Sequence, residues 1–192
     1  MTVEAFPEWL RPPPGGFTAD DLDRLPNLPP HTELIDGGLF FVSPQRAFHH
    51  LVISVLSNGL RDAVPGGLRV RAEMTVTLGR HQRPEPDVLV LDAAGVTDLN
   101  QTTYQPEHVR LVVEVVSPDS VDRDRVRKPL LYAEAGIPHF WRVENVEDRP
   151  VVYVHELDPA TRAYALTGIH HDRLKLSVPF DIDIDLTEID RL

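Results

Sequence analysis

The chain contains no cysteine, which excludes disulfides, thiolate catalysis, iron–sulfur clusters and cysteine-ligated zinc. It also lacks any apolar run near the roughly 18 residues that a membrane-spanning helix needs. Residues 1–16 have no apolar segment typical of a secretion signal. We therefore expect a cytoplasmic protein that does not enter a membrane.

Basic residues are the scarcer of the two charged types. The chain has 19 Lys and Arg against 30 Asp and Glu, which gives a net charge of −11 at pH 7. This balance argues against a protein that coats nucleic acid regardless of sequence, because such binding depends on neutralised phosphates. A nuclease is still compatible with it, since a bound metal ion can reverse the field of one cleft.

The length and composition fit one ordinary globular domain. The chain has 192 residues, of which 42% are hydrophobic and 26% are charged. A domain of this size buries a substantial core, so neither metal nor disulfide is needed for folding. The proline- and glycine-rich stretch at residues 12–16 separates a Pro-rich arm, residues 1–17, from a single domain, residues 18–192.

A hairpin and a helix are expected in the first third of the domain. Residues 33–42 are apolar on both sides of an Asp-Gly pair, which is typical of a tight hairpin turn. Ser43 is the expected N-cap of the following helix and Pro44 its first residue. Apolar residues at helical spacing give this helix one buried face, and the Pro-Gly-Gly at residues 65–67 ends it.

The rest of the chain predicts a central sheet. Residues 68–78 alternate apolar and polar, while residues 87–91 and 109–116 are rich in the β-branched residues of buried strands. A second helix is expected from Ser120 or Asp122 to Gly136, and because Pro129 lies inside it, either the helix kinks there or its first turn is irregular. A closing meander is expected at residues 140–144, 151–156 and 164–169. This order predicts an α/β fold of mixed α+β type, with helices flanking a mixed sheet.

Two acidic residues on neighbouring strands carry the clearest chemical signal. Asp87 begins one strand, and Glu114 lies inside the next apolar strand. A carboxylate is costly to bury unless it is paired, protonated or bound to a cation. Adjacent strands lie about 4.8 Å apart, so the two carboxylates could share one divalent ion. The alternative is an ordinary salt bridge, to Arg83 or Arg110.

Lys128 is the candidate partner of these acids. It follows Asp124 by four residues and precedes Tyr132 by four, so the three side chains share one helix face. A cation aimed at the two carboxylates would help to position water and to stabilise charge on a phosphoryl group. The alternative is an exposed Asp124–Lys128 pair of little energetic value.

Three further features are weaker. His49 and His50 are interpreted as a buried or solvated pair and not as ligands, because no paired histidine spacing accompanies them. The alternating acids of residues 181–186 are typical of the solvated face of an edge strand. One local basic patch could attract a phosphate backbone, and it comprises Arg123, Arg125, Arg127 and Lys128.

Taken in order, these motifs resemble a known superfamily. Asp87 after a proline, Glu114 in a strand and Lys128 on the following helix resemble the PD-(D/E)XK nucleases. More closely, the chain is similar to a large bacterial family of restriction-endonuclease-like proteins, long catalogued as a domain of unknown function. The resemblance covers about residues 18–190, and its further matches are Glu-Leu-Ile-Asp-Gly at 33–37, Glu-Val-Val-Ser-Pro-Asp-Ser at 114–120, and residues 135–138 and 140–143.

The resemblance implies a restriction-endonuclease-like core and a metal-dependent nuclease. Asp87 and Glu114 would bind Mg²⁺ or Mn²⁺, and the backbone carbonyl of Val115 would join them. Lys128 would take the catalytic lysine role, and Glu33 would add a ligand or a supporting hydrogen bond. The reaction would be metal-assisted hydrolysis of a phosphodiester in nucleic acid, with DNA as the expected substrate. By analogy, a homodimer is expected.

One departure from the superfamily pattern keeps other functions open. The usual lysine lies two residues after the acid, where this chain has Val116. The flexible stem of Lys128 allows the amine to reach the same place from the helix. The first alternative is an inactive nuclease fold that binds nucleic acid or a protein partner. The second is a phosphodiesterase that acts on RNA or nucleotides.

Overall fold

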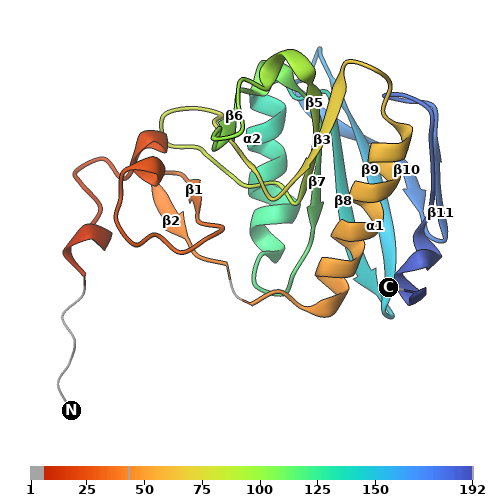
Figure 1. The fold of residues 1–192 in the computed structure, drawn as a ribbon, viewed down its shortest axis with the longest axis horizontal. Helices are drawn as coiled ribbons and strands as arrows, with labels where there is room; N and C mark the ends of the chain where they lie inside the picture. The colour runs from red at the N-terminus through yellow and green to blue at the C-terminus, as the bar shows by residue number, and fades with distance from the viewer. Residues whose placement is uncertain (1–6, 43, 192) are drawn as a thin grey trace.

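The computed structural model describes residues 7–42 and 44–191, and its centre is a six-stranded mixed sheet (Figure 1). The strand order is β10-β9-β8-β7-β5-β3. The strands are β3 (Leu68–Ala72), β5 (Val88–Asp92), β7 (Val109–Val115), β8 (His139–Val146), β9 (Arg149–Asp158) and β10 (Ala163–His170). Strands β7 and β8 are parallel, and the other neighbours in this sheet are antiparallel. The expected mixed α/β sheet is confirmed.

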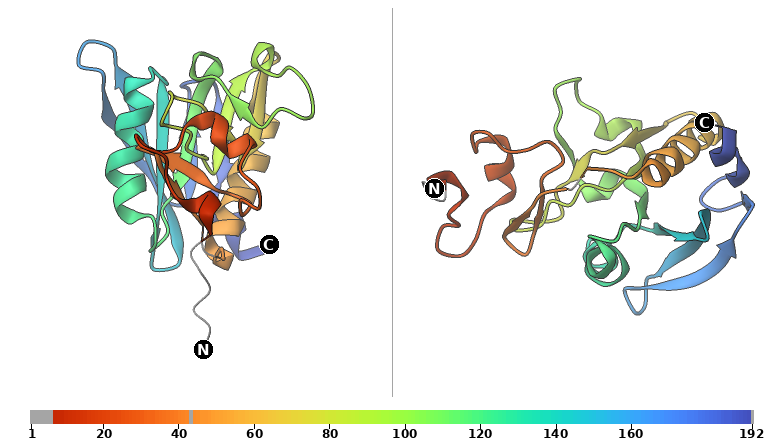
Figure 2. Two further views of the ribbon diagram at one scale, coloured as in Figure 1. Left: turned by 90° about the vertical axis from the view of Figure 1, so that its left-hand side faces the viewer. Right: turned by 90° about the horizontal axis from the view of Figure 1, so that it is seen from below.

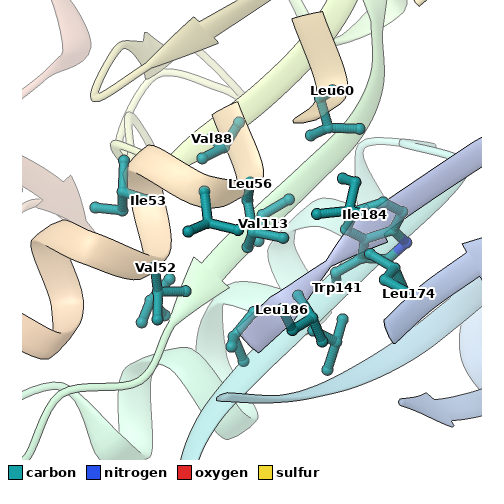
Figure 3. Close-up of a cluster of buried hydrophobic side chains, with 14 of the residues drawn as sticks. Val52, Ile53, Leu56, Leu60, Val88, Val113, Trp141, Leu174, Ile184 and Leu186 are labelled. Carbon is teal, nitrogen blue, oxygen red and sulfur yellow. The ribbon is translucent and has the colours of Figure 1, made fainter. Parts of the chain in front are cut away.

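Helix α1 (Ala47–Ala63) covers one face of the sheet (Figures 1 and 2). Its apolar side chains, among them Val52 and Leu56, pack on Val113 of β7 and on Trp141 of β8 (Figure 3). The side chains of a strand alternate between faces, so one set of β5 and β7 residues enters this cluster and the other set faces away.

The C-terminal segment closes over the same side of the sheet. Strands β11 (Arg173–Leu176) and β12 (Ile182–Asp185) form an antiparallel pair, and the 3-10 helix η6 (Leu186–Arg191) follows them. Ile184 and Leu186 extend the α1 cluster (Figure 3). The alternating acids predicted for this edge strand do face solvent, since Asp183 is exposed between buried isoleucines.

Helix α2 (Lys128–Glu134) covers the opposite face and connects the parallel strands β7 and β8. Parallel neighbours need such a crossover connection. Tyr132 and Ile137 pack there with Leu89 of β5 and Phe140 of β8. A π-helical turn, η5 (Arg123–Arg127), precedes α2, so of the two outcomes expected from Pro129, which has no N–H to donate, the irregular first turn is the one found.

The N-terminal segment lies at one end of the sheet (Figures 1 and 2). It contains the hairpin of β1 (Glu33–Ile35) and β2 (Gly38–Phe40), whose Asp36-Gly37 turn has both φ angles positive, as predicted. The shorter elements elsewhere are η1 (Glu8–Leu10), η2 (Ala19–Asp23), β4 (Thr75–Val76), η3 (Ala93–Gly95), β6 (Thr103–Tyr104) and η4 (Pro106–His108). Within the described ranges, no helix is both long and apolar enough to cross a membrane.

Two predicted boundaries are wrong. Helix α1 begins at Ala47 with Arg46 as its N-cap, not at Pro44, and the expected cap Ser43 lies outside the described residues. The single strand predicted for residues 68–78 is two strands, because Glu73 has a φ of 53° and turns the chain. Before that turn, β3 pairs with β5; after it, β4 pairs in parallel with β6.

Candidate active site

The sheet register brings the two predicted acids side by side. Val88 of β5 lies opposite Val113 of β7, and Asp87 and Glu114 are the next residues toward the same end of the sheet. Glu114 lies between Val113 and Val115 of the α1 cluster, so its side chain faces the α2 layer. The alternative salt bridges are wrong, because Arg83 pairs with Asp23 and Arg110 pairs with Asp92.

Lys128 reaches this pair of strands from the start of α2. Its Nζ lies 2.7 Å from Glu33 Oε1, 2.9 Å from Glu114 Oε2 and 3.2 Å from Asp124 Oδ1. The alternative of an exposed Asp124–Lys128 pair is wrong, because these residues are only 2% and 4% exposed. One ammonium group is therefore enclosed by three carboxyl groups.

Both oxygens of Glu114 are engaged on the α2 side. Oε2 accepts a hydrogen bond from Lys128, and Oε1 accepts one from the Tyr132 hydroxyl at 2.5 Å. Burial raises the pKa of the Glu114 carboxyl above its ordinary value, and the nearby acids add to this. Burial alone would lower the pKa of Lys128, but Glu114, Glu33 and Asp124 together raise it, so the amine stays charged.

Asp87 is held by its neighbouring strand and lies next to a histidine. Its Oδ2 accepts a hydrogen bond from the Val115 N–H at 2.5 Å. Its Oδ1 lies 3.3 Å from Nε2 of His49, on the first turn of α1. The interpretation of His49 as an ordinary core or surface histidine missed this contact. Its only signal in the sequence was a position beside the apolar face of the predicted helix.

A cavity of about 500 Å³ opens over these residues. The predicted site residues Glu33, Asp87, Glu114, Val115 and Lys128 all line it. Other acidic lining residues include Glu73, Glu85, Asp119, Asp124 and Glu144, and the basic ones are Arg46, Arg123, Arg125 and Lys128. The cavity is therefore predominantly acidic and would attract a cation before it attracted a phosphate.

The predicted basic patch is mostly neutralised by other side chains. Arg125 forms two hydrogen bonds with Glu144, and Arg127 pairs with Asp36 of the hairpin. Arg123 stacks over the ring of Phe40, with its guanidinium carbon 4.8 Å from the ring centre. The patch is thus weaker than the sequence suggested, and Arg123 is its one arginine without an acidic partner among the described residues.

The donor set of the cavity fits a hard divalent cation. No three histidine or acidic side chains are grouped as a ready metal site in the described part of the chain. Mg²⁺, however, keeps several waters and is commonly bound through one or two carboxylates. Asp87, Glu114 and the carbonyl of Val115 offer oxygen ligands only. Glu33 and Asp124 add negative charge that the single ammonium of Lys128 does not balance.

The family named Uma2, described as "Putative restriction endonuclease", matches residues 19–187. The chain belongs to the Uma2 family. This membership agrees with the resemblance drawn from the motifs, and it indicates a nuclease-like function, hydrolysis of phosphodiester bonds in nucleic acid. No protein with a curated description matches this Uma2 chain.

Two solved structures are similar to the Uma2 chain. One is described as a putative nuclease belonging to DUF820 from Anabaena variabilis, with 19% identity and a TM-score of 0.63 over 90% of this chain and 97% of that one. This similarity shows that the fold is shared. The other is NucC of P. aeruginosa in its cAAA-bound form, with 15% identity and a TM-score of 0.34 over 66% of this chain and 85% of that one. A similarity at this level carries no argument about function.

Proposed function

We propose that this Uma2 protein is a Mg²⁺- or Mn²⁺-dependent endonuclease that hydrolyses phosphodiester bonds in DNA. One observation carries the proposal. Glu33, Asp87, Glu114 and Asp124 all line one cavity, and Glu33, Glu114 and Asp124 surround the buried ammonium of Lys128. Burying so many carboxyl groups is unfavourable for folding, so a cation that binds there during function explains why they are present.

Asp87, Glu114 and the carbonyl of Val115 are the proposed metal ligands. The Val115 N–H fixes one oxygen of Asp87, and the Tyr132 hydroxyl fixes one oxygen of Glu114. Each carboxylate is thereby oriented before any ion enters. A divalent ion held by these residues would supply Lewis acidity, both to polarise a phosphoryl group and to lower the pKa of an attacking water.

Lys128 is the proposed electrostatic partner of the reaction. Its pKa is held above the ordinary lysine value by the surrounding carboxylates, so it carries a positive charge at neutral pH. A fixed charge in a site shielded from water stabilises the negative charge that develops on the phosphoryl oxygens. Glu33 forms an ion pair with Lys128 and accepts a hydrogen bond from the Glu85 N–H, so we assign it the role of positioning the lysine.

Calorimetric titration with Mn²⁺ tests the metal site before any substrate is known. The wild type is compared with a D87A/E114A variant, with and without a short DNA duplex, because metal affinity without substrate phosphate can be weak. The matched control is D181A/D183A, which removes the same charge from exposed positions at β12. Binding that is lost in the site variant and kept in the control supports the proposal. Equal binding in all three proteins, or none, overturns it.

Cleavage assays then separate the substrates. A panel of duplex DNA, single-stranded DNA, RNA and cyclic nucleotides is incubated with Mn²⁺ or Mg²⁺. We expect the wild type to cleave DNA, and we expect D87A/E114A and Lys128→Met to show no cleavage. Cleavage of RNA or nucleotides alone would favour the phosphodiesterase alternative. Metal-independent DNA binding without cleavage would favour an inactive fold, which the valine in the usual lysine position also suggests.

A further inference from the structure

We infer that His49 is a further ligand of the metal ion in the proposed site and that it makes the site prefer Mn²⁺ to Mg²⁺. The inference rests on the proposed metal-dependent function and extends it to a residue on α1, which is separate from the acidic strands. The sequence motifs gave this histidine no role. The geometry around Asp87 assigns it one.

The first observation is the distance between the two side chains. Nε2 of His49 lies 3.3 Å from Oδ1 of Asp87, which is longer than the roughly 2.9–3.0 Å of an ordinary N–H···O hydrogen bond. In an octahedral site with ligand bonds of about 2.1 Å, neighbouring donor atoms lie about 3.0 Å apart. The two atoms are thus already separated by nearly the spacing of adjacent ligands.

The second observation concerns the hydrogen bonds of the remaining polar atoms, Oδ2 of Asp87 and Nδ1 of His49. Oδ2 of Asp87 is occupied by the Val115 N–H, so Oδ1 is the oxygen that faces the histidine. Nδ1 of His49 is buried and has no hydrogen-bond partner among the described residues. Buried ring nitrogens of a structural histidine are normally satisfied. In His49, Nδ1 is left without a hydrogen bond while Nε2 points at Asp87, a proposed metal ligand. This arrangement is unfavourable for a structural histidine and indicates a functional one.

The third observation is the rigid placement of the ring. His49 lines the cavity from the first turn of α1, and its side chain is 13% exposed. Val52 and Leu56 on the following turns anchor this helix in the main core. Helix and strand therefore hold His49 and Asp87 in fixed positions, which a metal site requires of its ligands.

Ligand chemistry gives the preference between ions. Carboxylate and carbonyl oxygens suit both Mg²⁺ and Mn²⁺, whereas imidazole suits transition metals and is a poor ligand for Mg²⁺. Replacing one oxygen ligand by a histidine nitrogen therefore favours Mn²⁺. Without His49, the site would contain oxygen donors only, and the preference would be largely lost.

Pulsed electron paramagnetic resonance of bound Mn²⁺ tests the inference directly, because it detects a coordinated nitrogen without any need for activity. We expect a nitrogen hyperfine coupling in the wild type that disappears in His49→Gln. The matched control is His50→Gln, a neighbouring exposed histidine on the same helix. By calorimetry, His49→Gln should lose at least about tenfold in Mn²⁺ affinity while its Mg²⁺ affinity changes less than about twofold.

The outcomes separate this inference from the proposed function. Mn²⁺ that binds the wild type without nitrogen coupling overturns the role of His49 and leaves the acidic metal site intact. A coupling that persists in His49→Gln, or disappears in His50→Gln, also overturns it. If the wild type binds no Mn²⁺ with or without the DNA duplex, the proposed function fails together with the inference.

Discussion

Lys128 is the residue on which the electrostatics of the cavity depend. Its ammonium group has three N–H donors, and three carboxyl groups surround it, from Glu33, Glu114 and Asp124. One positive charge cannot neutralise three negative ones. Burial raises the pKa of Glu114, the most deeply buried of the three acids, and the neighbouring carboxyl groups add to this shift. Without a bound cation, the ionised form of this acid opposes folding.

We therefore predict that Glu114→Gln stabilises the metal-free protein at pH 7 by about 1 kcal/mol, the usual scale for relieving an unfavourable functional residue. Because the pKa of Glu114 is higher in the folded state, the folded protein binds more protons between the unfolded and folded pKa values. The free energy of unfolding then falls as pH rises through that window, from about 4.5 upward. The variant should lack this decline.

Urea unfolding in the presence of a chelator, from pH 4.5 to 8, measures the effect. The control is Asp183→Asn, at an exposed acid whose pKa is lowered by its hydrogen bond to Arg173. This control should not gain stability at pH 7. A Glu114→Gln variant that is less stable than the wild type across the whole range would contradict the prediction.

At the scale of elements, local sequence patterns predicted the positions of helices and strands, but they did not predict which strands pair with each other. The apolar face of α1 was predicted from helical periodicity, and β5 and β7 from their runs of β-branched residues, because burial imposes both patterns. The alternation predicted for residues 68–78 breaks down, because Val70 packs in the cluster beneath α1 and Val76 in the cluster beneath α2. It gave no sign of the turn at Glu73, whose N–H donates to the Asp87 carbonyl, a contact between distant segments.

Gly59 in α1 is an element-scale example of packing that overrides helix preference. A Cβ at this position would lie 2.6 Å from Cγ1 of Ile184 on β12. Alanine is favoured over glycine in helices by about 1 kcal/mol, whereas overpacking costs about 1–3 kcal/mol. We predict that Gly59→Ala lowers the free energy of unfolding by about 1 kcal/mol, as measured by urea denaturation.

Two comparisons isolate the cause of this loss. Asn58→Ala, at the neighbouring exposed position, should be neutral or slightly stabilising. Adding Ile184→Val to Gly59→Ala should recover part of the loss, since residues in contact give non-additive effects. A stabilised Gly59→Ala variant would show that β12 moves away from α1 without cost.

At the scale of the whole molecule, the candidate site combines four separate stretches of chain: the β1 hairpin, α1, the β5–β7 strands and the segment from η5 into α2. The sequence predicted Asp87, Glu114 and Lys128, because acids in apolar strands and a lysine on the next helix are visible locally. It could not predict the contact of His49, which depends on how closely α1 approaches the start of β5. Nor could it predict that the neighbouring arginines are neutralised by the acids Asp36 and Glu144.

The net charge of −11 should make DNA binding depend on bound cations. A strongly acidic protein repels a polyanion, and the cavity itself is acidic, so phosphate can approach only after cations occupy it. We predict that a hydrolysis-resistant phosphorothioate duplex binds at least about tenfold more tightly in Mn²⁺ than in chelator, with an affinity that falls as salt rises. Fluorescence anisotropy at constant ionic strength measures this difference.

The D87A/E114A variant distinguishes a bound ion from general screening. Its two missing charges should weaken repulsion, so in chelator it binds the duplex at least as well as the wild type does. Added Mn²⁺ should then bring it no gain, because the proposed ligands are gone. If Mn²⁺ strengthened binding equally in both proteins, the ion would act on the DNA or by screening. If the wild type bound equally well in chelator, its exposed arginines would suffice to hold the phosphate backbone. In either case the cavity would not be where the DNA is recruited.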